Sequence, residues 1–204
     1  MVDVGAGTGI ETEVLVRESS VPVHAVEPCR AMRTPLLARI ARLPACSRAR
    51  VTVHPCPAEE TGLRHVADLA VASNVIPCVP PAGRRAIWHA IANALAPGGL
   101  LLFDPPPAHP ALPGRWSLPP VQVGPDVYRA DVTSTPHNGA QRLRFTYRVH
   151  REGRVVREEH EDFTPWPTHP AVITREPTSA GLIPVPTPHP DLRAAVLPAW
   201  RPEK

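Results

Sequence analysis

The segment Val2-Asp3-Val4-Gly5-Ala6-Gly7-Thr8-Gly9 determines the expected fold of this chain. A short apolar strand leads into glycines at every second position, and residues 10–16 then favour a helix. Glycine is needed where the backbone adopts conformations closed to other residues, or where a ligand contacts the backbone. A strand, a glycine-rich turn and a helix N-terminus together predict a site for a nucleotide-like ligand.

An acidic residue at the end of the next strand supports this prediction. Residues 21–26 are typical of a buried strand, and it ends on Glu27, 18 residues after Gly9. This separation is close to the roughly 20 residues expected for the acid that holds ribose hydroxyls in such units. The two oxygens of a carboxylate can accept hydrogen bonds from both hydroxyls of one ribose. The dinucleotide fingerprint requires a glycine where Ile10 stands, which disfavours an oxidoreductase with a nucleotide cofactor.

The first half of the sequence alternates between strand and helix signals. Further strands are expected at residues 51–54, 68–72 and 100–104, and helices at 31–43 and 82–95, with Pro97-Gly98-Gly99 ending the second helix. Because crossovers between parallel strands are right-handed, this alternation predicts a doubly wound, Rossmann-like α/β sheet over residues 1–104.

The second half of the sequence is rich in β signals. Residues 105–120 contain many prolines and no sustained period, which predicts a linker or a loop on the substrate side. Residues 143–149 alternate apolar side chains with arginines, and residues 154–163 return after the Glu152-Gly153 turn, which predicts an antiparallel hairpin. The arginine row is either the solvated face of this hairpin or a substrate-facing patch. We expect residues 121–204 to be a β-rich part that completes the sheet and forms the substrate side.

Composition limits the partners of the chain. A net charge of +3 is too small to indicate nucleic-acid binding, no apolar run reaches membrane-spanning length, and no secretory signal is present. The four cysteines and ten histidines show no metal-ligand spacing, so we expect free thiols in a reducing cytoplasm and no metal. We therefore expect a cytoplasmic protein with a small-molecule partner and without a nucleic-acid or membrane partner, and a homodimer is compatible with the sequence.

The Asp-x-Gly-x-Gly-x-Gly pattern of residues 3–9 resembles motif I of the class I S-adenosylmethionine-dependent methyltransferases. Residues 68–76 resemble the fourth-strand motif of this superfamily, and residues 95–100 resemble its loop before the fifth strand. The resemblance implies that the chain binds S-adenosyl-L-methionine. It further implies that Asp3 and the backbone of Gly5, Ala6, Gly7 and Gly9 face the methionine part, that Glu27 holds the ribose, that Ala58 and Glu59 contact the adenine, and that Asn74 lies near the sulfonium.

The acceptor of the methyl group can be narrowed by exclusion. Residues 74–77 lack the Asn/Asp-Pro-Pro-aromatic pattern of the enzymes that methylate adenine or glutamine, and no basic clusters accompany Cys78 as in cytosine methyltransferases. The chain therefore resembles the small-molecule methyltransferases, and we expect transfer to an oxygen or nitrogen of a small molecule such as a secondary metabolite. No catalytic residue is identified, because His109, His150 and His160 are candidate bases by residue type alone.

Several departures from the superfamily leave a second function open. Pro57 stands where many relatives carry an Asp that contacts the adenine amino group, and prolines follow Phe163 where relatives carry a helix. The sequence begins one residue before the first strand, so we expect that the segment that covers the cofactor in relatives lies upstream, that it comes from elsewhere, or that the site is decayed. The alternative function is a non-catalytic cofactor-binding or scaffold protein that retains the methyltransferase fold.

Overall fold

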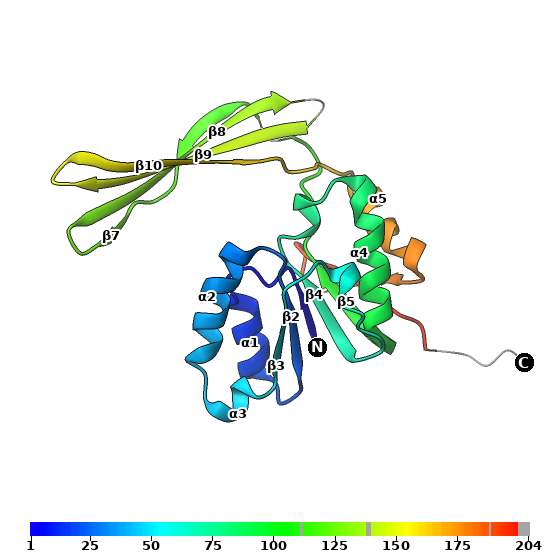
Figure 1. Cartoon of the computed structure of the whole chain (residues 1–204). Coiled ribbons are helices and arrows are strands. Elements are labelled where there is room, and N and C mark those ends of the chain that lie inside the picture. Colours follow the sequence, from blue (N-terminus) through cyan, green and yellow to red (C-terminus); the bar gives the residue numbers. More distant parts are fainter. Residues whose placement is uncertain (111, 138–139, 188, 200–204) are drawn as a thin grey trace, which may run out of the picture. The chain divides into compact units, whose positions relative to one another are not determined.

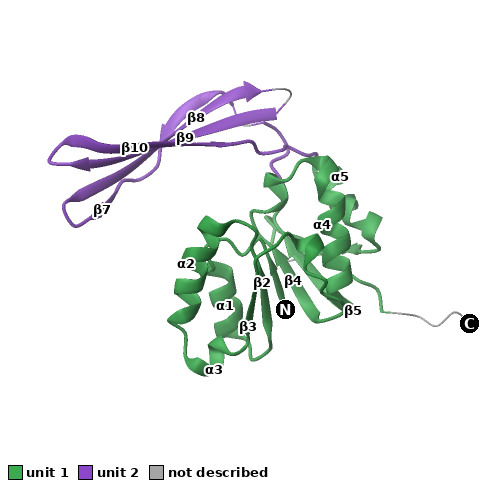
Figure 2. Ribbon diagram, viewed as in Figure 1, with its two compact units in different colours: residues 1–105, 170–204 green, residues 106–169 purple. Residues whose placement is uncertain are grey.

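The computed structural model describes residues 1–110, 112–137, 140–187 and 189–199 of the chain. Two compact units are present, one formed by residues 1–105 with the described part of 170–204, and the other by residues 106–169 (Figure 2). Each unit contains one β-sheet.

The sheet of the first unit has seven strands in the order β11-β12-β5-β4-β1-β2-β3 (Figure 1). Its strands are β1 (Val2–Val4), β2 (Val23–Val26), β3 (Val51–His54), β4 (Ala67–Ala72), β5 (Leu95–Phe103), β11 (Ile183–Val185) and β12 (Arg193–Val196). Strands β1 to β5 run parallel, whereas β12 is antiparallel to both β5 and β11. The predicted doubly wound α/β sheet is therefore confirmed. The strand order reverses between β1 and β4, and ligands of such sheets bind outside the carboxyl ends of the strands at this point.

Helices cover both faces of this sheet. Successive residues of a strand point to opposite faces, so each strand contributes side chains to both layers of helices. The helices of the unit are α1 (Ile10–Glu18), α2 (Arg30–Ala41), α3 (Ala45–Arg48), α4 (Pro81–Ala94) and α5 (Pro170–Arg175), with the short 3₁₀ helices η1 (Ala58–Glu60), η2 (Ile76–Cys78) and η3 (Glu176–Ala180). Ala25 packs with Leu36 of α2, whereas the next residue, Val26, belongs to the cluster that contains Trp88 of α4. None of the helices in the described residues is both long and apolar enough to cross a membrane.

The second unit is an antiparallel sheet with strands in the order β10-β9-β8-β6, and β7 also pairs with β8. Its strands are β6 (Gly114–Ser117), β7 (Val121–Val123), β8 (Asp126–His137), β9 (Ala140–Arg151) and β10 (Arg154–Phe163). β9 and β10 form the predicted hairpin. Glu152 and Gly153 both have positive φ angles, of 50° and 76°, which is the conformation of a tight two-residue hairpin turn.

Two local features differ from the sequence expectations because contacts between distant segments determine them. Within the expected loop 105–120, residues 114–117 form β6 through pairing with residues 131–134 of β8. Four residues are too few to show a period in the sequence. The strand β5 begins at Leu95, directly after α4, and thus includes Pro97-Gly98-Gly99. The reason is pairing with the C-terminal segment, since Gly98 N donates to Leu197 O at 2.7 Å and Leu197 N donates to Gly99 O at 2.9 Å.

The C-terminal part of the chain divides between the two units. Residues 121–163 lie in the antiparallel sheet, whereas the segment from Pro170 onward returns to the first unit and adds β12 and β11 beside β5. Prolines restrict the intervening helices α5 and η3 to six and five residues.

Candidate cofactor site

A cavity of about 590 Å³ lies at the carboxyl ends of β1, β2 and β4. This volume is within the usual range for small-molecule and cofactor sites. The cavity is lined by Val4, Gly5, Gly7, Val26, Glu27, Pro28, Met32, Pro57, Ala58, Glu59, Ser73, Asn74, Val75, Cys78, Val79, Gly83 and Ile87. The structure thus brings together six of the residues expected at the site, namely Gly5, Gly7, Glu27, Ala58, Glu59 and Asn74.

The glycine-rich turn is attached to the end of the neighbouring strand. The backbone N–H groups of Gly5 and Ala6 donate to Val26 O at 2.8 and 3.0 Å. Ala6 points away from the cavity, because its side chain is buried in the cluster with Ala25 and Leu36. The turn is therefore fixed at the carboxyl end of β1 by the end of β2, and its backbone forms one wall of the cavity.

Gly7 and Gly9 are required for different physical reasons. Both have positive φ angles, of 54° and 84°, which residues with a side chain adopt at a cost. A Cβ atom on Gly9 would lie 2.5 Å from Leu36 Cδ1, so this glycine allows close packing of the turn on α2. A Cβ atom on Gly7 would meet only Gly5 O within 4 Å, at 3.8 Å, and Gly7 lines the cavity. The bare backbone of Gly7 therefore faces open space that a ligand can occupy.

The Glu27 carboxylate connects the turn to the beginning of α2. Its Oε2 accepts a hydrogen bond from Gly7 N at 2.8 Å, and its Oε1 accepts one from Cys29 N at 2.7 Å. Glu27 is buried at 6% exposure and lines the cavity. Because each carboxylate oxygen has a second lone pair, Glu27 retains the capacity to accept from two further donors.

Asp3 lies below the glycine-rich turn and is completely buried. The Thr12 hydroxyl donates to Asp3 Oδ2 at 2.5 Å, whereas Oδ1 has no hydrogen-bond partner in the described residues. Burial raises the pKa of Asp3 to about 6. An unsatisfied buried acceptor is costly and rare in native proteins. Asp3 is not among the residues that line the cavity, so the structure places this carboxylate behind the glycine-rich turn.

The opposite wall of the cavity is formed by the turn after β4. Asn74 has a φ angle of 56°, and its N–H donates to Asp104 Oδ1 at 2.5 Å. Its carbonyl oxygen lies 2.9 Å from Cys78 Sγ. Burial raises the pKa values of both Asp104 and Cys78. Asp104, at the end of β5, thus holds the backbone of Asn74 in its left-handed conformation.

The remaining walls consist of apolar side chains that the motifs did not indicate. Met32 comes from α2, Val79 precedes α4, and Ile87 lies on α4. Met32 and Ile87 belong to helices whose apolar periodicity is that of any core helix, so only the packing shows that they line a cavity. Among the described lining residues the two that carry charge are Glu27 and Glu59, both acidic. The cavity is therefore suited to a ligand with a flat or apolar part and a positive charge.

The three histidines considered as bases lie in the second unit. His160 Nε2 is 3.3 Å from Glu158 Oε1 on the same strand, and His150 Nε2 is buried without a hydrogen-bond partner in the described residues. Within those residues no three His, Cys, Asp or Glu side chains come together as a metal site.

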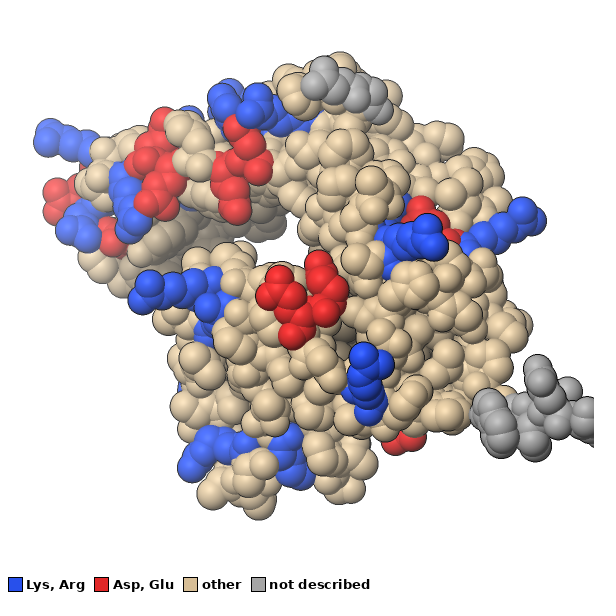
Figure 3. Space-filling model, turned by 45° about the vertical axis from the view of Figure 1, so that its right-hand side comes forward, with Lys and Arg blue, Asp and Glu red and all other residues tan. Residues whose placement is uncertain are grey.

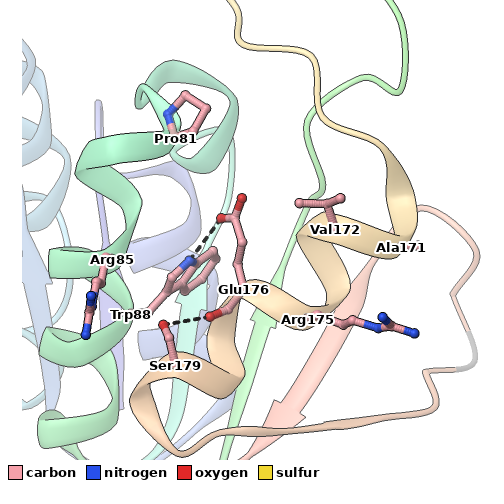
Figure 4. A pocket seen from close by; sticks show the side chains of 8 residues that line it. All are labelled: Pro81, Arg85, Trp88, Ala171, Val172, Arg175, Glu176 and Ser179. Atoms are coloured by element: carbon pink, nitrogen blue, oxygen red, sulfur yellow. Dashed lines mark hydrogen bonds between the residues drawn. The ribbon is translucent and has the colours of Figure 1, made fainter.

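A second hollow lies between α4 and the α5–η3 segment (Figure 4). Trp88 Nε1 donates to Glu176 Oε2 at 3.2 Å, and Arg84 Nη1 lies 3.3 Å from Glu176 Oε1. The Arg84 side chain is fully buried, and burial lowers its pKa. A buried guanidinium requires a paired acid. Glu176 therefore has a structural role that joins α5 and η3 to α4.

Comparisons with known proteins found one matching family model and several solved structures of similar fold. Residues 2–101 match a family model described as a methyltransferase domain. A search of curated proteins found no match. The fold is similar to that of SAM-bound CalS10, an amino pentose methyltransferase from Micromonospora echinaspora involved in calicheamicin biosynthesis, with a TM-score of 0.76, 21% identity, and coverage of 96% of this chain and 81% of that chain.

Two further solved structures show the same similarity. DesVI from Streptomyces venezuelae has a TM-score of 0.78 and 22% identity, over 97% of this chain and 83% of that chain. The sugar N-methyltransferase KedS8 from Streptoalloteichus sp ATCC 53650 has a TM-score of 0.75 and 22% identity, over 97% of this chain and 79% of that chain.

Proposed function

Because residues 2–101 form a methyltransferase domain of the class I fold, we propose that the chain transfers a methyl group from S-adenosyl-L-methionine to an oxygen or nitrogen of a small molecule. The observation that carries this proposal is the cavity formed by the bare backbone of Gly7 and the carboxylate of Glu27 at the carboxyl ends of the strands. CalS10 is described as an amino pentose methyltransferase and KedS8 as a sugar N-methyltransferase, which supports an amino sugar or related metabolite as the acceptor.

The residues of the cavity fit this cofactor. S-adenosylmethionine carries a sulfonium and an ammonium, and the charged side chains that line the described cavity are both carboxylates. The ammonium would supply the donor that Asp3 Oδ1 lacks among the described residues. The bare backbone at Gly5 and Gly7 would allow the methionine part to approach closely.

The nucleoside would occupy the rest of the cavity. The free lone pairs of Glu27 would accept from the ribose hydroxyls. The adenine would lie between the apolar side chains of Met32 and Ile87 and contact Ala58 and Glu59, and Asn74 would lie near the sulfonium. Residues 1–104 would thus bind the cofactor, while residues 121–204 would supply the substrate side in addition to the strands that complete the sheet.

The chemistry required of the chain is modest. The cofactor supplies an already activated methyl group. The chain contributes by aligning the acceptor with the methyl carbon and sulfur and by excluding water, and near-attack geometry can lower such a barrier by roughly 7–11 kcal/mol. An unprotonated amine acceptor needs no general base, whereas a hydroxyl acceptor does.

Calorimetry followed by a transfer assay tests the proposal. We expect S-adenosylhomocysteine to bind and NAD to show no binding, and we expect labelled methyl transfer to at least one member of a panel of amino sugars and hydroxylated metabolites. NAD binding without S-adenosylhomocysteine binding would contradict the cofactor assignment. Cofactor binding without transfer across a broad panel would instead support the non-catalytic alternative.

The proposal also includes the location of the protein in the cell and its oligomeric state. All four cysteines are free, which supports a location in the reducing cytoplasm. We also propose that the chain is a homodimer.

A further inference from the structure

The groove between α4 and the α5–η3 segment is a cavity of about 640 Å³, which is within the usual range of small-molecule sites. All of its lining residues belong to the first unit. Arg85 and Trp88 of α4 line the groove. Gly83 and Ile87 of the same helix line the cofactor cavity instead. Helix α4 therefore separates two cavities, and the groove is not part of the cofactor site.

The floor of the groove is apolar and held in place from below. It includes the side chains of Pro81, Trp88 and Val172, and Val172 is 52% exposed. The indole of Trp88 is fixed, because its Nε1 donates to Glu176 Oε2 at 3.2 Å and its ring centroid lies 5.1 Å from that of Phe103. A preformed apolar floor binds a flat molecule without the cost of ordering side chains first.

The groove also has a surplus of positive charge. Arg85 and Arg175 line it with exposed side chains, and neither takes part in an ion pair within the described residues. Among the described lining residues Glu176 is the single acid, and it already pairs with the buried Arg84 at 3.3 Å. Figure 3 shows basic side chains exposed on the part of the molecule that carries α4 and α5, with a smaller acidic area between them.

The two unpaired guanidinium groups come from different sides of the floor. Figure 4 shows Arg85 on one side of Trp88 and Glu176, and Arg175 on the other. A guanidinium matches the geometry of a carboxylate, which accepts two parallel hydrogen bonds from it. Two guanidinium groups are too few for the backbone of a nucleic acid, and a concave apolar floor between them favours a small molecule.

We propose that the groove binds a small organic dianion in which a flat apolar body separates two carboxylate groups. The body contacts the apolar floor, and the carboxylates accept hydrogen bonds from Arg85 and Arg175. This site is additional to the cofactor cavity and does not depend on methyl transfer.

An NMR titration of the full chain with terephthalate tests this proposal, with the indole N–H signal of Trp88 as the reporter inside the groove. We expect saturable binding with a dissociation constant on the order of 1 mM, as is usual for a ligand of this size. Arg85→Gln and Arg175→Gln should each weaken binding about 5-fold or more. Val172→Glu, which places an acid on the floor, should weaken binding about 10-fold.

Arg64→Gln is the matched control, because Arg64 is an exposed arginine of the first unit that does not line the groove. This variant should bind terephthalate like the wild type. Thermal unfolding verifies that each variant is folded. Two further probes separate the contributions, since benzyl alcohol has the apolar body without charge and succinate has the charges without the body. Both should bind about 10-fold more weakly than terephthalate.

The place of binding is checked by repeating the titration with S-adenosylhomocysteine added. We expect the affinity for terephthalate to be retained, because the two cavities lie on different sides of α4. Loss of terephthalate binding on this addition would show that the probe occupies the cofactor cavity, and would overturn the proposal.

Three other results would also overturn it. The first is the absence of saturable binding up to about 20 mM terephthalate. The second is an affinity that is unchanged in both groove arginine variants, or that falls equally in Arg64→Gln. The third is equal affinity for terephthalate and either of the two simpler probes. The arginine variants locate the probe whether or not the chain binds S-adenosylhomocysteine, so failure of the proposed methyl transfer would be a separate result.

Discussion

Replacing Asp3 by Asn should stabilise the ligand-free protein at neutral pH while it weakens cofactor binding. Asp3 is completely buried, and its pKa is raised by burial from 3.8 to about 6. The native state therefore binds its proton more tightly than the unfolded state does. As the pH rises from about 4 to above 6, ionisation of Asp3 costs stability that Asn does not lose.

The magnitude follows from the pKa difference. A shift from 3.8 to about 6 corresponds to about 3 kcal/mol at full ionisation, at 1.36 kcal/mol for each pKa unit. At about pH 4.5 roughly a third of this cost is present, so the free energy of unfolding of Asp3→Asn should gain about 2 kcal/mol relative to wild type between pH 4.5 and pH 7.5. Affinity for S-adenosylhomocysteine should fall about 10-fold or more, because a charged hydrogen bond contributes about 1.5–3 kcal/mol.

Urea unfolding at both pH values and calorimetry with S-adenosylhomocysteine provide the measurements. Asp68→Asn is the matched control, since Asp68 is exposed and the substitution should change neither quantity appreciably. A stability difference between Asp3→Asn and wild type that is the same at both pH values would refute the reasoning on burial. Unchanged affinity in Asp3→Asn would remove the orphaned oxygen as support for the cofactor site.

Four further changes separate binding from folding. Gly7→Val should abolish S-adenosylhomocysteine binding in calorimetry, because the side chain enters the cavity, with a loss of only about 1–2 kcal/mol in unfolding free energy from the positive φ; retained binding would show that no ligand approaches there. Gly9→Val should instead lower thermal stability sharply, because its Cβ atom has no space, and a melting temperature like that of Gly7→Val would contradict this distinction. Glu27→Ala should weaken cofactor binding by about 1–3 kcal/mol in the same calorimetric assay, with unchanged affinity as the contrary result. Glu176→Ala should destabilise the fold by about 3 kcal/mol in urea unfolding, because the buried Arg84 guanidinium loses the carboxylate that pairs with it, and a loss below about 1 kcal/mol would show that this pair is not essential.

Local patterns in the sequence were sufficient to predict the core of the fold and the residues on one side of the candidate site. The positions of Gly5, Gly7 and Gly9 imply positive φ angles, and all three have them. The strands and helices of the first half follow from apolar periodicity, because the periods of 2 and 3.6 are properties of neighbouring residues. The position of Glu27 follows from the fixed length of a strand-helix-strand unit.

Tertiary structure alone decided the features that depend on contacts between distant segments. The expected loop 105–120 contains β6 because residues 131–134 lie beside it, and β5 extends through Gly98 because Leu197 pairs with it. The apolar wall formed by Met32 and Ile87 has the same sequence pattern as a buried core, and only packing leaves these side chains facing a cavity.

Sequence and tertiary structure also differ in what they show about hydrogen bonds, ion pairs and the faces of the sheet. The sequence shows that Asp3 is acidic, but it does not show that Asp3 Oδ1 has no hydrogen-bond donor among the described residues. The sequence also shows that apolar and basic residues alternate over 142–150, but it does not show the ion pairs that neutralise Arg144 and Arg148. Periodicity states which residues share a face of a sheet, whereas the register between strands determines what each face contacts. The sequence by itself thus determined the type of fold and the positions of the glycine-rich turn and Glu27, and the three-dimensional packing decided which side chains surround them in one cavity.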